Sequence, residues 1–170
     1  MATLPWRARV ITCSDAASAG QREDRSGPAT RDLLVRHGFT VDEVQIVPDS
    51  VEQIGGAIVT AVDRDHIDLV VTTGGTGIAP RDVTPEATDM VTGRKIPGFG
   101  ELMRSVSLEK TPMAALSRAQ AAVRGAALVV NLPGSVAGAT ENLAAILHLL
   151  PHALDLLSGA RVEDHPPGKD

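Results

Sequence analysis

Apolar runs rich in β-branched residues alternate along the chain with segments in which apolar residues recur at helical spacing. The strands that this pattern predicts run from Arg7 to Ser14, Thr40 to Val47, Leu69 to Thr73 and Ala127 to Leu132. The last two are short and β-branched, which is typical of interior strands covered on both faces. Strands and helices in alternation predict a layered α/β fold with a largely parallel sheet.

Capping residues, prolines and glycines mark the helix boundaries. The predicted helices run from Pro28 to Gly38, Ser50 to Asp63, Thr84 to Gly93, Glu101 to Leu108 and Ala137 to Leu157, with a restart at Pro151. Thr84 directly precedes Pro85 and is predicted to be the N-cap of its helix. The segment from Ser117 to Val123 stays open, although its alanines favour a helix.

A polar or glycine-rich segment directly follows each predicted strand. These segments are Ser14-Asp15, Pro48-Asp49, Thr73 to Asp82 and Asn131 to Ser135. In an open parallel sheet, ligands bind at the carboxyl ends of the strands, so the four segments are expected to meet along one edge. The sequence therefore predicts a single crevice to which all four contribute.

The run Thr73-Gly74-Gly75-Thr76-Gly77 has the composition of a phosphate-binding loop. Its glycines allow the backbone to approach an anion closely, and its amide and hydroxyl groups can donate hydrogen bonds. It lacks both the Gly-Lys-Ser/Thr of a Walker loop and the glycine spacing of a dinucleotide fingerprint. On its own, the run is explained equally well as a tight turn between a strand and a helix.

Two aspartates, Asp49 and Asp82, are the candidate catalytic residues and metal ligands. Each also has a structural explanation, because aspartate commonly caps helices. If Thr84 caps its own helix, Asp82 is free for other work, whereas the second helix has either Asp49 or Ser50 as its cap. Two carboxylates on one edge can hold Mg²⁺ against substrate phosphates, and a cation relieves the repulsion between them.

Two further segments carry candidate ligand-binding groups. Ser135 either caps a helix or donates to a ligand, and capping is the commoner role. The polar run from Ser18 to Gly27, which follows Asp15, is predicted to form a mobile loop over the same edge of the sheet. Arg22 and Arg25 in this loop could contact a polyphosphate, although loop arginines are more often simply solvated.

Composition excludes several classes of function. A net charge of −5 and a content of two Phe, one Trp and no Tyr argue against nucleic-acid binding. The single cysteine, Cys13, rules out an internal disulfide and is expected to pack in the core. No run is apolar for long enough to be a signal peptide or a membrane span, so a cytoplasmic protein without membrane contact is expected. The length of 170 residues predicts one domain over residues 1–160, followed by a mobile tail at 161–170.

Together the motifs resemble the molybdenum-cofactor biosynthesis domain family in order and spacing. The segments that carry the resemblance are Ser14-Asp15, Glu23 to Pro28, Pro48-Asp49, Thr73 to Gly77, Arg81 to Glu86, Pro97 to Glu101, Leu116 to Arg118 and Asn131 to Ser135. Within that family the chain looks like the stand-alone molybdopterin adenylyltransferases and the N-terminal domain of gephyrin. The resemblance implies a three-layer α/β/α fold with a mostly parallel central sheet, in which the segment from Ser117 to Val123 is an edge strand that can be antiparallel.

The resemblance also implies an activity. Such a protein transfers AMP from Mg-ATP to the terminal phosphate of molybdopterin and releases pyrophosphate, usually as a homotrimer and alongside other enzymes of the molybdenum-cofactor pathway. Asp49 and Asp82 would act at the Mg²⁺. The residues implied to contact the pterin phosphate or the nucleotide are Ser14, Asp15, Gly74, Gly75, Thr76, Gly77, Pro133, Gly134 and Ser135. The alternative is a non-catalytic molybdopterin carrier or scaffold, which would share these loops without consuming ATP.

Overall fold

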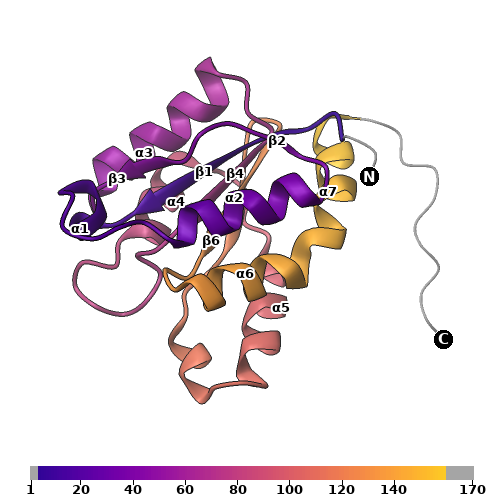
Figure 1. The fold of residues 1–170 in the computed structure, drawn as a ribbon. Coiled ribbons are helices and arrows are strands. Elements are labelled where there is room, and N and C mark those ends of the chain that lie inside the picture. Colours follow the sequence, from indigo (N-terminus) through magenta and orange to yellow (C-terminus); the bar gives the residue numbers. More distant parts are fainter. Residues whose placement is uncertain (1–3, 160–170) are drawn as a thin grey trace.

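A six-stranded sheet lies at the centre of the computed structural model, which describes residues 4–159 (Figure 1). Across the sheet the order is β2 (Thr40–Val41), β1 (Arg7–Cys13), β4 (Leu69–Thr73), β6 (Ala127–Leu132) and β5 (Ala121–Arg124), and β3 (Gln45–Val47) also pairs with β1. Every pairing is parallel except that of β5 with β6. The predicted, largely parallel sheet is therefore confirmed.

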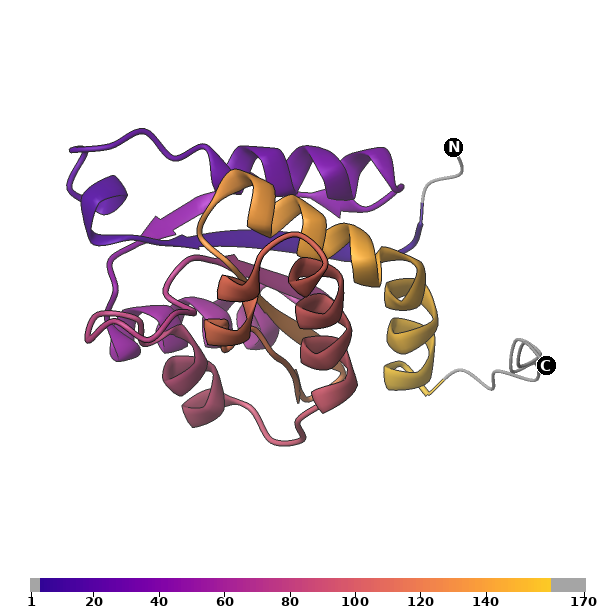
Figure 2. The same ribbon diagram turned by 90° about the horizontal axis from the view of Figure 1, so that it is seen from below.

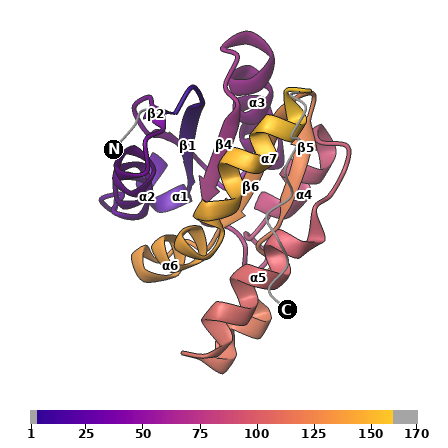
Figure 3. The ribbon, with the colours of Figure 1, turned by 90° about the vertical axis from the view of Figure 1, so that its right-hand side faces the viewer.

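Helices cover both faces of the sheet, which gives three layers (Figures 1 and 3). One face carries α2 (Ser26–Arg36), α5 (Pro97–Leu108), α6 (Val136–Ile146) and α7 (Leu150–Leu157), and the other carries α3 (Val51–Val59) and α4 (Thr84–Val91). Val71 of β4 is buried in the first core and its neighbour Val70 in the second, because successive strand residues point to opposite faces. Figure 2 shows α2 and α6 side by side over the first face.

The segment that the sequence leaves open between helix and strand becomes the antiparallel edge strand β5. A two-residue turn at residues 125–126, with Gly125 at φ +58°, connects it to β6. Ala121 and Ala122 are buried against the neighbouring elements. The pairing with β6 therefore outweighs the helical preference of alanine in this segment.

The single strand expected from Thr40 to Val47 is wrong, because the structure has two short strands, β2 and β3, along β1. Between the end of β2 and the start of β3, this segment contains one residue more than the facing part of β1. Asp42 lies in the interruption, and its carboxylate pairs with Arg9 of β1 at 2.8 Å. An extra residue of this kind breaks the ladder of hydrogen bonds locally.

The predicted helices are present, with some ends shifted. The Ser50 hydroxyl accepts the N–H of Gln53 at the start of α3, as expected of an N-cap, and α3 continues into the π-helical turn η1 (Thr60–Arg64). Two 3₁₀ turns are also present: η2 (Pro112–Leu116) lies between α5 and β5, and η3 (Leu147–Leu149) lies between α6 and α7. As predicted, Pro151 lies in the first turn of α7.

Thr84 is not the N-cap that the sequence predicts. It is the first residue of α4, and its hydroxyl donates to the carbonyl oxygen of Gly74 at 2.9 Å instead of capping the helix. The residue at the cap position, Val83, makes no side-chain cap hydrogen bond. The Thr84 hydroxyl, which the local sequence predicts to cap α4, is therefore bonded to the glycine turn after β4.

Two predictions concern the membrane and the tail. Among residues 4–159, no helix has the length and apolar character needed to cross a bilayer. The tail at residues 161–170 lies outside the described residues. The boundary of the single domain at residue 160 remains a prediction.

Candidate active site

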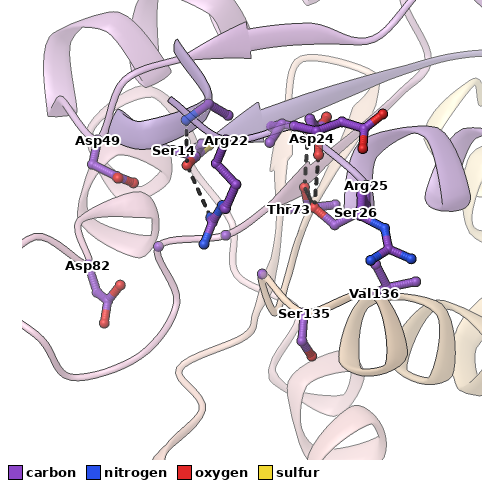
Figure 4. A pocket seen from close by; sticks show the side chains of 17 residues that line it. Ser14, Arg22, Asp24, Arg25, Ser26, Asp49, Thr73, Asp82, Ser135 and Val136 are labelled. Atoms are coloured by element: carbon purple, nitrogen blue, oxygen red, sulfur yellow. Dashed lines mark hydrogen bonds between the residues drawn. The ribbon is translucent and has the colours of Figure 1, made fainter. Parts of the chain in front are cut away.

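The carboxyl ends of β1, β3, β4 and β6 meet at a cavity of about 690 Å³ (Figure 4). All four polar segments that follow the predicted strands contribute to it, so the expected crevice exists. The predicted site residues that line it are Ser14, Asp49, Gly74, Gly75, Asp82, Gly134 and Ser135. Parallel pairing brings these residues together, because it places the ends of all four strands at the same edge.

Asp49 and Asp82 both face this cavity, on the same side of it (Figure 4). The Asp49 Oδ2 accepts the backbone N–H of Asp15 at 2.9 Å, whereas its Oδ1 is buried without a hydrogen-bond partner. The Asp82 Oδ2 accepts the N–H of Ala79 at 2.9 Å, which fixes the turn before α4. The two carboxylates thus face one cavity from the loops that follow two different strands, β3 and β4.

The charge of Asp49 is unfavourable where it stands. Burial raises the pKa of Asp49, and the neighbouring negative charges of Asp15 and Asp82 raise it further. The hydrogen bond from Asp15 N–H and the positive charge of Arg81 act in the opposite direction. A cation between the two aspartates would relieve this repulsion and would provide a partner for the unpaired Oδ1.

The oxygen atoms of Asp49 and Asp82 suit Mg²⁺, which in many enzymes takes one or two carboxylates and completes its shell with water and substrate phosphates. No group of three or more His, Cys, Asp or Glu side chains within residues 4–159 is arranged to hold a metal ion. The residues present therefore fit a Mg²⁺ ion shared with a phosphate ligand, not one enclosed by protein alone.

The glycine turn after β4 is packed too closely for side chains. Gly74 and Gly75 have φ values of +94° and +64°, in the left-handed region that favours glycine. A Cβ at Gly74 would lie 2.3 Å from the carbonyl oxygen of Cys13, and one at Gly134 would lie 3.1 Å from the Cα of Gly74. The two glycine turns after β4 and β6 therefore touch, and they form one wall of the cavity.

Three other predicted residues, Thr76, Gly77 and Pro133, lie outside the main cavity. They line an adjoining hollow of about 330 Å³, which shares Gly75, Gly134 and Asp82 with it. The structure thus divides the predicted binding residues between two connected hollows.

Asp15, Ser14 and Ser135 have structural partners as well. Asp15 does not line the main cavity, because its carboxylate forms an ion pair with Arg81 and accepts the N–H of Asp49 at 3.0 Å. The Ser14 hydroxyl caps α1 (Asp15–Ser18), and the Ser135 hydroxyl caps α6 by accepting the N–H of Gly138 at 3.0 Å. Both serines line the cavity while they act as caps.

Arg118 is a residue of the site that the sequence reasoning missed. Its backbone N–H donates to the carbonyl of Thr76, and its guanidinium donates to the carbonyls of Gly77 and Asp82 at 2.7 and 2.6 Å. It also forms an ion pair with Glu86 of α4. Arg118 therefore holds both ends of the loop that carries Asp82, and its inclusion in the Leu116 to Arg118 motif was the only signal.

A buried hydroxyl network on the far side of the cavity from Asp49 was also missed. The Asp24 carboxylate accepts hydrogen bonds from the Thr12 hydroxyl at 2.6 Å and from the Ser26 hydroxyl at 3.3 Å. Ser26 and Thr73 are joined by a hydrogen bond of 3.1 Å between their hydroxyl groups. The network ties the start of α2, which begins at Ser26 instead of Pro28, to the ends of β1 and β4.

Cys13 lines the cavity wall but is 3% exposed, and burial raises its pKa to about 12. Thiolate is the reactive form of cysteine, so this raised pKa lowers the reactive fraction of Cys13 at pH 8. We expect alkylation of the native protein by iodoacetamide at pH 8 to be about a hundredfold slower than that of the urea-unfolded chain. Equal rates by mass spectrometry would contradict the packing described for Cys13.

Comparison with known proteins gives consistent matches over most of the chain. Residues 9–152 match the family described as "Probable molybdopterin binding domain". The molybdopterin adenylyltransferase of Helicobacter pylori (strain ATCC 700392 / 26695) is 43% identical, over 88% of this chain and 86% of that protein. The molybdopterin adenylyltransferase of Escherichia coli (strain K12) is 38% identical, over 94% of this chain and 89% of that protein.

The fold is shared with solved structures. The crystal structure of the molybdopterin biosynthesis enzyme MoaB from Thermus thermophilus superposes with a TM-score of 0.86 at 49% sequence identity. The match covers 91% of this chain and 97% of that one. The three-layer α/β/α architecture is thus the one found in these relatives.

Proposed function

This chain belongs to the molybdopterin binding domain family, and from that premise we propose that it is a molybdopterin adenylyltransferase that uses Mg-ATP. The observation that carries the proposal is the cavity in which Asp49 and Asp82 face the glycine turns at residues 74–75 and 134–135. Carboxylates that can hold a divalent ion and backbone amides that can receive phosphate are the two requirements of nucleotidyl transfer.

The proposed reaction forms one bond and breaks one. An oxygen of the terminal phosphate of molybdopterin attacks the α-phosphorus of ATP. The bond between the α-phosphorus and the oxygen that bridges to the β-phosphorus breaks, and pyrophosphate leaves with the electron pair of that bond. A phosphate monoester is already largely anionic at neutral pH, so the protein needs to supply no general base.

Positioning and charge compensation are then the tasks of the protein. Asp49 and Asp82 would hold the Mg²⁺ ion, which when bound supplies positive charge to the ATP phosphates. Gly75 and Gly134 have no side chains that would keep a phosphate from their backbone amides, whereas the N–H of Gly74 already donates to the carbonyl of Leu132 at 3.1 Å. Arg118 keeps the Asp82 loop in place through its bonds to the carbonyls of Gly77 and Asp82.

A direct assay tests this proposal. We expect the purified chain, incubated with molybdopterin, ATP and Mg²⁺, to yield adenylylated molybdopterin by mass spectrometry and an equal amount of pyrophosphate. A control without Mg²⁺ is expected to yield neither product. Binding of molybdopterin without release of pyrophosphate would instead identify a non-catalytic carrier of the same family.

Three further properties are proposed on the family resemblance. They are assembly as a homotrimer, location in the cytoplasm, and action together with other enzymes of the molybdenum-cofactor pathway. Light scattering of the purified chain tests the first of these, since a monomer would have a third of the mass of the expected particle.

A further inference from the structure

Two arginines, Arg22 and Arg25, lie on the rim of the main cavity, and neither has an acidic partner within residues 4–159. Both side chains line the cavity and are exposed. Among the residues that the structure describes, the guanidinium of Arg22 makes one long hydrogen bond, 3.4 Å to the Ser14 hydroxyl, and the side chain of Arg25 makes none. They are the only cationic residues among those that line this cavity.

The loop that carries the two arginines, part of the run that the sequence predicts to be mobile, is held at its base by hydrogen bonds to buried hydroxyl groups. Asp24 lies between them in the sequence and in Figure 4, and it accepts hydrogen bonds from the Thr12 and Ser26 hydroxyls and from the N–H of Gly27 at 3.1 Å. A Cβ on Gly27 would lie 2.4 Å from the Thr12 Oγ1. The two guanidinium groups are thus presented by a segment whose base is buried and tightly packed.

The cavity lining carries charges of both signs, because Glu23 and Asp24 line it together with Arg22 and Arg25. Asp49 and Asp82 lie on the side of Arg22 that is away from Arg25, so the order across the cavity is carboxylates, first arginine, second arginine (Figure 4). The helices α2 and α6, of 11 residues each, begin near Arg25 with Ser26 and Val136 (Figure 4). Their N-terminal dipoles add to the attraction for anions there.

We propose that Arg22 and Arg25 form the subsite for the β- and γ-phosphates of the nucleoside triphosphate, which leave together as pyrophosphate. This inference rests on the proposed function and deepens it. Two cations in series match two phosphates in series, whereas the single terminal phosphate of the pterin would leave one arginine without a partner. Negative charge grows on the leaving pyrophosphate during the reaction, and this is where positive side chains are most effective.

The test is a comparison of ligands that differ only in the number of phosphates. The affinities of the variants Arg22→Ala, Arg25→Ala and the double variant for ATP and for AMP, both with Mg²⁺, are measured by isothermal titration calorimetry. We expect each single change to weaken ATP binding by about tenfold and the double change by about a hundredfold, while AMP binding changes by less than about twofold. Arg36→Ala is the matched control, since Arg36 is an exposed arginine in the last turn of α2 and lies outside the cavity.

The possible outcomes separate this inference from the proposed function. Equal losses of ATP and AMP affinity, or ATP affinity that is unchanged in the double variant, would overturn the subsite. Such results would leave the adenylyltransferase activity of the parent chain intact. If the parent protein bound no ATP, the proposed function itself would fail. The variants are expected to keep the melting temperature of the parent, because neither arginine has an ion pair to lose within residues 4–159.

Discussion

Replacement of either Asp49 or Asp82 by asparagine is expected to slow adenylyl transfer by about a hundredfold to a thousandfold. Asparagine has nearly the same shape as aspartate but lacks the charge that would hold a divalent ion against the ATP phosphates. Both side chains face the cavity, and the Asp49 Oδ1 has no hydrogen-bond partner among the described residues. The measurement is the rate of pyrophosphate release under saturating ATP and molybdopterin.

The pH dependence of stability gives an independent check on Asp49→Asn. Burial raises the pKa of Asp49 above its usual value of 3.8, so between the two pKa values the folded chain keeps a proton that the unfolded chain has lost. Stability therefore falls as the pH rises through that window and stays lower above it. We expect this fall to be absent in Asp49→Asn, as measured by urea unfolding at a series of pH values.

The exposed Asp32 of α2 provides the matched control. Within residues 4–159 its side chain pairs only with the neighbouring Arg31, at 3.5 Å, and it lies outside the cavity. Asp32→Asn is expected to change neither the rate nor the pH dependence measurably. Normal turnover by Asp49→Asn or Asp82→Asn would contradict the assignment of a metal site to these two residues.

Replacement of Gly74 by alanine is expected to lower the free energy of unfolding by about 2 to 5 kcal/mol. Gly74 has φ +94°, where an L side chain is strained, and the new Cβ would lie 2.3 Å from the Cys13 carbonyl oxygen. That oxygen belongs to the backbone of β1, which is paired on both sides in the sheet, and it has little freedom to move. Urea unfolding of the purified variant measures the loss.

Gly56→Ala serves as the control for Gly74→Ala, because the same chemical change is made where the structure has room. Gly56 is exposed in the interior of α3, and its Cβ would meet nothing within 4 Å. Alanine is a better helix former than glycine, so this variant is expected to be more stable by about 0.5 to 1 kcal/mol. Similar effects of the two substitutions would mean that the turn after β4 is not packed as described.

The sequence by itself determined the parts of this protein that depend on local chemistry. The runs from Leu69 to Thr73 and from Ala127 to Leu132 are both strands, because short β-branched apolar segments suit the interior of a parallel sheet. The position of the cavity also followed from the sequence, because the residues after each parallel strand lie at the same edge of the sheet, at the carboxyl ends of the strands. The sequence therefore predicted that Asp49 and Asp82 lie at the same site.

Only the tertiary structure decided the features that depend on partners distant in the chain. Thr84 fits an N-cap by its local sequence, yet its hydroxyl is taken by the carbonyl of Gly74, ten residues earlier. Arg118 fixes the Asp82 loop from 36 residues away, and no local pattern indicates which carbonyls a guanidinium will reach. The segment from Ala121 to Arg124 is a strand because its backbone pairs with β6 in an antiparallel ladder of hydrogen bonds. Local sequence sets what each residue can donate or accept, but packing selects the partner.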